Sequence, residues 1–109
     1  MSGWLYIIKN GDLYKIGITK NFDNRMRQLK PDCVIAKLFS SNFLDLEKEL
    51  HKRYKDLRIP QTEYFRLDHI HVREIKKRIS KFYYPRNITY NTFALSFCLL
   101  LVLFLLIFL

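Results

Sequence analysis

Cysteine is scarce in this chain of 109 residues, which contains only Cys33 and Cys98. Cys98 lies in an apolar C-terminal segment while Cys33 lies among charged residues, so an intramolecular disulfide is implausible. No paired spacing of the kind that binds zinc is present either. The sequence therefore excludes a disulfide-stapled scaffold and a structural zinc site, and we expect reduced thiols in a domain that faces the cytosol.

Charge is missing altogether from residues 92–109. All 19 Lys and Arg and all 10 Asp and Glu precede this segment, which gives a formal net charge of +9. About ninety residues remain for a soluble domain, which is enough for one small core. An excess of positive charge this large predicts a polyanionic partner, either nucleic acid or an anionic membrane surface.

The uncharged segment itself predicts a transmembrane helix. A helix of 18 residues is about 27 Å long, close to the roughly 30 Å of the bilayer core. It lacks the polar face of the alternative, a buried core helix. Tyrosines precede it, and the basic residues between 76 and 86 predict that the domain faces the cytoplasm. No N-terminal signal peptide is visible. We expect a single-pass C-terminal anchor, or the first span of a longer protein.

The strongest local signal is the dipeptide Asn10-Gly11 between two runs of β-branched and aromatic residues. It predicts a hairpin with a type I′ turn. With these two residues as the loop, Tyr6 lies opposite Lys15. Side chains directly opposite each other on antiparallel strands interact, so we expect the Tyr6 phenol to pair with the Lys15 ammonium.

Further elements follow along the chain. Asn21 is a plausible N-cap for a short helix that Pro31 ends. Residues 34–40 predict a third strand, a second helix begins near Asn42, residues 63–67 are extended, and residues 68–82 predict a third, basic helix. At about 100° per residue, Arg25 borders the apolar stripe of its helix and Arg27 points to water. Glu47 borders the apolar face of the second helix in the same way.

An ordered set of motifs resembles the GIY-YIG nuclease superfamily: Leu5-Tyr6-Ile7, then Lys15-Ile16-Gly17, then Arg25, then Glu47 on a helix. Tyr14-Lys15-Ile16-Gly17 is similar to the second motif of the short phage-type DNA-binding branch, which also occurs in meiotically up-regulated gene products. Leu46-Glu47-Lys48-Glu49-Leu50-His51 and Glu63-Tyr64-Phe65 are similar to its later blocks. The resemblance covers residues 3–67.

This resemblance implies an α+β fold with a three-stranded antiparallel sheet and packed helices, and hydrolysis of phosphodiester bonds with one Mg²⁺ or Mn²⁺. Tyr6 would assist as general base, Arg25 would bind phosphate and Glu47 would hold the metal. Lys15 would favour the phenolate of Tyr6. We expect DNA rather than RNA as the partner, with no small-molecule cofactor. The expected nucleic-acid contacts are Lys20, Arg25, Arg27 and His51.

Alternatives remain open at this level. The first motif reads Trp4-Leu5-Tyr6, and Lys15 replaces a tyrosine hydroxyl, so the domain either cleaves nucleic acid or only binds it. His51 fits a helix-surface residue better than a metal ligand, and Glu63 can simply cap or brace the segment after the loop. A membrane-surface adaptor whose basic helix contacts anionic lipid is a third possibility. We divide the chain into the domain (1–67), the basic helix with a linker (68–91) and the transmembrane tail (92–109).

Overall fold

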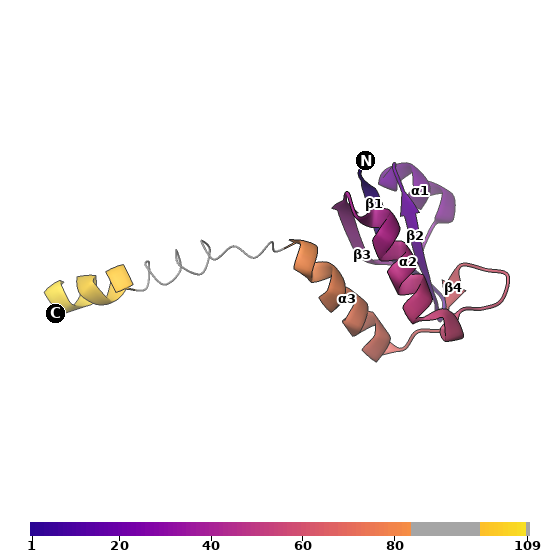
Figure 1. Cartoon of the computed structure of the whole chain (residues 1–109). Helices are drawn as coiled ribbons and strands as arrows, with labels where there is room; N and C mark the ends of the chain where they lie inside the picture. The colour runs from indigo at the N-terminus through magenta and orange to yellow at the C-terminus, as the bar shows by residue number, and fades with distance from the viewer. Residues whose placement is uncertain (84–98, 109) are drawn as a thin grey trace.

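The computed structural model describes residues 1–83 and 99–108. Four strands form one sheet in the order β3-β1-β2-β4, in which each neighbouring pair is antiparallel. Helices pack on this sheet (Figure 1), so the expected α+β class is confirmed. The expected number of three strands is wrong, because Tyr64–Phe65 adds a short fourth strand, β4, beside β2.

The hairpin of β1 (Gly3–Asn10) and β2 (Leu13–Thr19) is present, but its predicted register is wrong by two residues. Asn10 pairs with Leu13, so the loop is Gly11 and Asp12. Among the described residues of this loop only Gly11 has a positive φ, at 59°. Glycine at the first loop position is typical of a type II′ turn rather than type I′. Tyr6 consequently lies opposite Gly17, and Lys15 lies opposite Ile8.

Long-range hydrogen bonds of Asn10 explain this register. Its side-chain oxygen accepts from the backbone of Asp32 at 3.0 Å, and its amide nitrogen donates to the Tyr64 hydroxyl at 3.1 Å. The Asp32 carboxylate in turn accepts from the backbone N–H of Gly11 at 2.7 Å. Asn10 therefore ends the strand and joins three parts of the chain, instead of forming the turn.

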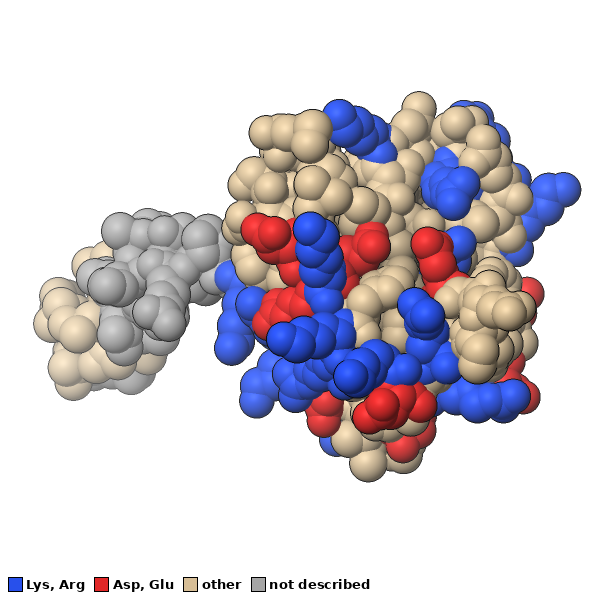
Figure 2. Space-filling model, turned by 45° about the vertical axis from the view of Figure 1, so that its right-hand side comes forward, with Lys and Arg blue, Asp and Glu red and all other residues tan. Residues whose placement is uncertain are grey.

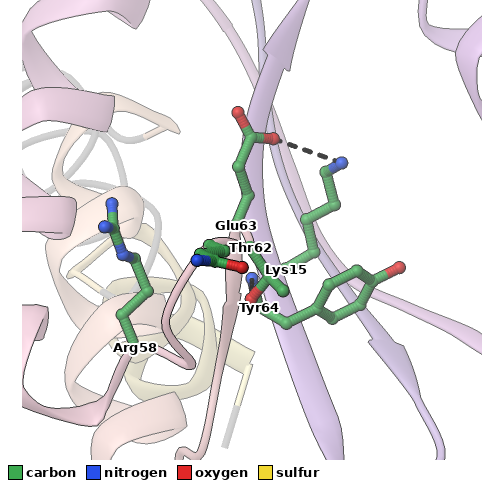
Figure 3. Close-up of a pocket in the computed structure, with 6 residues that line it drawn as sticks. Lys15, Arg58, Thr62, Glu63 and Tyr64 are labelled. Carbon is green, nitrogen blue, oxygen red and sulfur yellow. Dashed lines mark hydrogen bonds and ion pairs between the residues drawn. The ribbon is translucent and has the colours of Figure 1, made fainter.

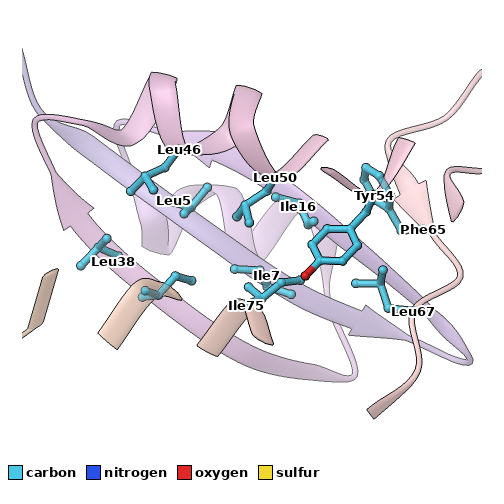
Figure 4. Packing of buried hydrophobic residues seen from close by; sticks show 11 residues of the cluster. Leu5, Ile7, Ile16, Leu38, Leu46, Leu50, Tyr54, Phe65, Leu67 and Ile75 are labelled. Atoms are coloured by element: carbon cyan, nitrogen blue, oxygen red, sulfur yellow. The ribbon is translucent and has the colours of Figure 1, made fainter. Parts of the chain in front are cut away.

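The core lies on one face of the sheet, beneath α2 (Phe43–Arg53) and α3 (His69–Tyr83). Leu46 and Leu50 of α2 and Ile75 of α3 meet Leu5 and Ile7 of β1 there (Figure 4). A 3₁₀ turn, Lys55–Leu57, follows α2. Because the side chains of α3 belong to this same core, the basic helix packs as part of the domain.

On the opposite face of the sheet, α1 (Phe22–Leu29) packs through Phe22 against Trp4, and none of the residues of this helix is fully buried. Asn21 caps this helix as expected, accepting from the backbone of Asn24 at 3.0 Å. The helix ends at Lys30, which is left-handed with φ 46°. The third strand, β3 (Cys33–Ser40), follows and forms one edge of the sheet.

Residues 99–108 form a short helix whose side chains are all large, apolar and exposed. Within the described parts of the chain, no helix combines the length and the apolar character needed to cross a membrane. The rest of the predicted span, residues 92–98 and residue 109, lies outside the described residues, as do Tyr84 and Tyr90.

Candidate functional site

The candidate site forms along one edge of β2. β4 pairs with β2 only at Tyr14 and Lys15, so from Ile16 onward this edge has no strand partner within the described ranges. The free carbonyl oxygen of Ile16 is instead 2.7 Å from Nε2 of His51 on α2. Because a carbonyl can only accept, His51 carries its proton on Nε2. Side chains from both faces of the sheet can therefore meet at this edge.

Tyr6 reaches this edge from β1. A Cβ atom on Gly17 would lie 2.5 Å from the phenol oxygen of Tyr6 and 2.6 Å from its Cζ atom, so the ring lies directly over the glycine. The second motif thus needs glycine because the phenol occupies that space. Tyr6 is only 1% exposed, which fixes the position of its hydroxyl.

Arg25 approaches the same phenol from α1. Hydrogen bonding with Tyr6, and then charge interaction with Tyr6 and Glu63, raises the pKa of Arg25. The side chain is half-buried and also donates to Gln28 at 3.3 Å, whereas Arg27 is exposed. The helical spacing predicted this difference between the two arginines.

Lys15 does not pair with Tyr6, contrary to the expectation from the sequence. Its register position opposite Ile8 takes it away from the phenol, and its ammonium lies 3.2 Å from the carboxylate of Glu63 (Figure 3). The Lys15 side chain is 10% exposed and that of Glu63 is 59% exposed. Lys15 also lies over the ring of Tyr64, 5.7 Å from its centroid. Arg25, rather than Lys15, is therefore the cation that interacts with the Tyr6 phenol.

Glu47 enters the site from α2. Within the described residues, the basic group nearest to its carboxylate in the ion-pair contacts is Nε2 of His51 at 4.0 Å, one helical turn away. Burial raises the pKa of Glu47; His51 and Lys15 act to lower it, and the neighbouring Glu63 acts to raise it. The charges of the Lys15–Glu63 ion pair thus both act on Glu47. A half-buried carboxylate without a close Lys or Arg is suited to bind a cation.

His51 has a positioning role in this geometry. Its Nε2 is engaged by Ile16, and its ring packs edge-on against Phe65 with centroids 5.0 Å apart. The side chain is 21% exposed. His51 therefore fixes α2 against the free edge of β2, which holds Glu47 beside the site, and its Nε2 atom is not free to ligate a metal.

An open pocket of about 500 Å³ adjoins the site. Figure 3 shows its lining, in which Arg58 lies across from Lys15. This pocket was not predicted from the sequence, where Glu63 had no role beyond its motif block and a possible brace. The block Glu63-Tyr64-Phe65 was the one sequence feature that pointed to this segment. Its pairing with Lys15 could not be predicted, because Lys15 is far away in the chain. The pocket residues are Lys15, Arg58, Gln61, Thr62, Glu63 and Tyr64.

The remaining predicted contacts lie outside this convergence. Lys20 is exposed and its ammonium is 3.2 Å from the sulfur of Met1, while Arg27 faces solvent on α1. Basic and acidic side chains lie close together on the face shown in Figure 2. Arg78 of α3 is paired with Glu49, through bonds of 3.1 and 3.2 Å. The predicted basic face of α3 is thus partly neutralised.

The residues fit a divalent metal only as a site with one protein carboxylate. No group of three or more His, Cys, Asp or Glu that could hold a metal ion occurs in residues 1–83 and 99–108. Mg²⁺ commonly binds through one or two carboxylates and completes its shell with water and substrate phosphate oxygens. Glu47 can supply that carboxylate.

Comparisons with known proteins give one family. The T5orf172 domain matches residues 3–82, from the start of β1 into α3 and well over half of the chain. Neither the curated proteins nor the solved structures gave a match. The chain belongs to the T5orf172 domain family, and its domain is therefore of a nucleic-acid-binding or nuclease-like kind.

Proposed function

We propose that this domain binds nucleic acid and hydrolyses phosphodiester bonds with one Mg²⁺ or Mn²⁺, in the manner of GIY-YIG nucleases. The observations that support the proposal are that Tyr6 lies over Gly17 of β2 and interacts with Arg25, and that the carboxylate of Glu63 influences both Arg25 and Glu47. The phenol, the guanidinium and the carboxylate come from β1, α1 and α2, three elements that are separate in the chain. Phosphodiester hydrolysis requires a base, charge neutralisation and a metal.

Two cations would bind the scissile phosphate. Arg25 offers a planar fork of donors that matches phosphate oxygens. Lys15 already holds a carboxylate oxygen at 3.2 Å, which marks its ammonium as a place for an anion. Glu63 forms an ion pair with Lys15, and its negative charge also acts on Arg25. A phosphate that replaced Glu63 beside Lys15 would therefore be attracted by Arg25 as well.

Tyr6 would act as general base in its phenolate form, which would accept the proton of the attacking water and become the phenol. The guanidinium of Arg25, which interacts with Tyr6, would lie beside the reacting oxygen. Because Tyr6 is almost fully buried, its hydroxyl is held in one position, which favours proton transfer only when the phosphate is bound against the same edge.

Glu47 would hold the divalent metal, which when bound stabilises the charge on the leaving oxygen. The raised pKa of Glu47 supports this role, since a carboxylate that is costly to ionise alone gains from a cation. His51 keeps Glu47 in place through its bond to Ile16.

A metal-dependent cleavage assay on the full chain in a non-ionic detergent tests the proposal. Cutting should require Mg²⁺ or Mn²⁺, and Glu47→Ala should abolish it while oligonucleotide binding is retained. Glu49→Ala is the matched control, because Glu49 is on the same helix but pairs with Arg78 away from the site. Equal cutting by both variants would refute the assignment of Glu47.

Binding without cleavage is the second candidate function. The burial of Tyr6, at 1% exposed, favours it, because a general base must reach water. If the wild-type chain binds oligonucleotides but cuts none with either metal, the domain is a binding module and the hydrolytic proposal fails.

We also propose that the C-terminal segment tethers the domain to a membrane, with the domain on the cytoplasmic side. The support is the uncharged sequence of residues 92–109 and the exposure of every described side chain of residues 99–108, each by at least 48%. The full chain should remain in the membrane fraction after a high-salt or carbonate wash, because salt screens charge but not hydrocarbon burial. Extraction by salt would contradict the tether.

A further inference from the structure

The face of the sheet on which α1 packs carries an aromatic patch, which we define as Trp4, Phe22, Phe39 and the side chain of Lys37. Trp4 lies between the other two rings, with centroid distances of 5.5 Å to Phe22 and 5.2 Å to Phe39. The ammonium of Lys37 is 4.7 Å from the centroid of Phe22 and 5.5 Å from that of Trp4.

The patch is open to solvent at Phe39, which is 57% exposed. Helix α1 is short and contributes no fully buried residue, so it covers Trp4 from one side only. Exposing the apolar ring of Phe39 to water is unfavourable. The ring also contributes little to the core, because the core lies on the other face of the sheet. Exposed aromatic rings flanked by a cation are instead typical of surfaces that stack nucleobases.

The register connects this patch to the candidate site. Lys37 of β3 lies opposite Tyr6 of β1, and Tyr6 lies opposite Gly17 of β2. Their side-chain positions therefore share one face, as do those of Trp4 and Phe39. Two strand spacings separate β3 from β2, or about 10 Å. At about 3.4 Å per stacked nucleotide, that distance corresponds to about three nucleotides.

We propose that the aromatic patch binds unpaired nucleotides and feeds the strand across Tyr6 to the candidate site. The substrate class would then be nucleic acid with a single-stranded segment next to the cleaved bond, an inference that rests on the proposed function. A base would stack on Phe39, and the ammonium of Lys37 would contact its phosphate. Paired bases cannot do this, because their faces are already stacked within the duplex.

Charge supports nucleic acid as the occupant. Lys37 lies within the patch, and exposed Lys20 and Arg27 flank it on the chain segment that carries Phe22. Asp23, at the start of α1, is the acidic neighbour in that segment. The whole chain carries a net charge of +9, so a polyanion is attracted to this face and a second copy of the chain is repelled.

The fluorescence of Trp4 provides a direct test, because it is the only tryptophan of the chain. The full chain in non-ionic detergent, with EDTA to prevent cleavage, is titrated with a single-stranded 12-mer and with the same sequence as a duplex. The single strand should quench Trp4 and bind roughly tenfold more tightly than the duplex. Phe39→Leu should weaken single-strand binding about tenfold, and Phe39→Tyr should restore it.

Ile70→Ala is the control, because Ile70 is 53% exposed but lies on α3, and it should bind as wild type does. Equal affinity for single strand and duplex would overturn the proposal, as would equal effects of Phe39→Leu and Ile70→Ala. Quenching by anionic vesicles but not by oligonucleotides would assign the patch to lipid, and a change with protein concentration alone would assign it to a second copy. Loss of cleavage with retained single-strand binding would refute only the hydrolytic function.

Discussion

The phenol of Tyr6 occupies the space that a side chain at position 17 would need. Gly17→Ala must therefore move either the ring or the strand. Because Tyr6 is closely surrounded, we expect a loss of stability of about 1–3 kcal/mol and, since a displacement near 1 Å is costly in catalysis, a loss of cleavage of about a hundredfold. Denaturant unfolding and the cleavage assay measure the two effects.

Gly11→Asn is the matched control for that substitution. Gly11 has φ 59° with open space around it, and asparagine tolerates such a conformation. The variant should fold and cut nearly as wild type does. Equal losses at positions 11 and 17 would mean that glycine matters only for the backbone, and not for the placement of Tyr6.

The charged carboxylate of Glu47 lowers the stability of the metal-free protein. Because burial raises its pKa in the folded protein above the ordinary 4.5, the charged form is disfavoured by folding. Wild-type stability should therefore be lost, relative to Glu47→Gln, as pH rises from about 4.5 through the raised pKa. At pH 7 without metal, Glu47→Gln should have the higher Tm, and at pH 4 the two should be equal.

Glu49→Gln, two residues along the helix, should show no such gain, because Glu49 is an exposed partner of Arg78. Thermal unfolding of the three proteins at the two pH values makes the comparison. A lower Tm for Glu47→Gln than for wild type at pH 7 would mean that the carboxylate already has a stabilising partner in the metal-free protein.

At the scale of elements, α1 places its two arginines in different environments. Arg25 is half-buried and interacts with Tyr6, and Arg27 is exposed. Arg25→Ala should lower cleavage by about 10²–10³-fold, as does the loss of one transition-state donor, while Arg27→Ala should leave it within a few-fold. Similar effects of the two substitutions on kcat would contradict the placement of α1.

Tyr54, the residue that caps α2, contributes one of the contacts with α3, because its hydroxyl donates to Glu74 at 2.8 Å. Burial and this bond raise the pKa of Tyr54 to about 12. Tyr54→Phe should cost about 1 kcal/mol of unfolding free energy. The wild-type advantage should be complete below pH 10 and disappear as pH rises through about 12. Urea unfolding at pH 8 and pH 12 tests this, and an advantage unchanged at pH 12 would exclude the bond as its source.

Local patterns predicted most elements correctly. The cap at Asn21, the helical stripe of α1 and the orientation of Arg25 all depend on neighbouring residues, so the sequence was sufficient. The hairpin register was not predictable in this way, because Asn10 bonds to Asp32 and Tyr64. For the same reason, pairing of Lys15 with Glu63 and the fourth strand could not be foreseen. These contacts join distant segments, and turn propensity alone carries no information about them.

At the scale of the whole molecule, we propose one central feature, a site at the free edge of β2 that holds a divalent metal through Glu47. The chain surrounds this edge with β1, α1, α2 and the segment before β4. Amide signals from these elements are therefore the right place to observe the metal, independently of whether a given substrate is cut.

Paramagnetic line broadening by Mn²⁺ in amide spectra of the full chain is the most direct measurement. At substoichiometric Mn²⁺, the account predicts selective broadening of the amides of Glu47, His51 and Gly17, which disappears in Glu47→Ala and persists in Glu49→Ala. Broadening centred elsewhere, for example at Asp68, or equal broadening in both variants, would contradict it.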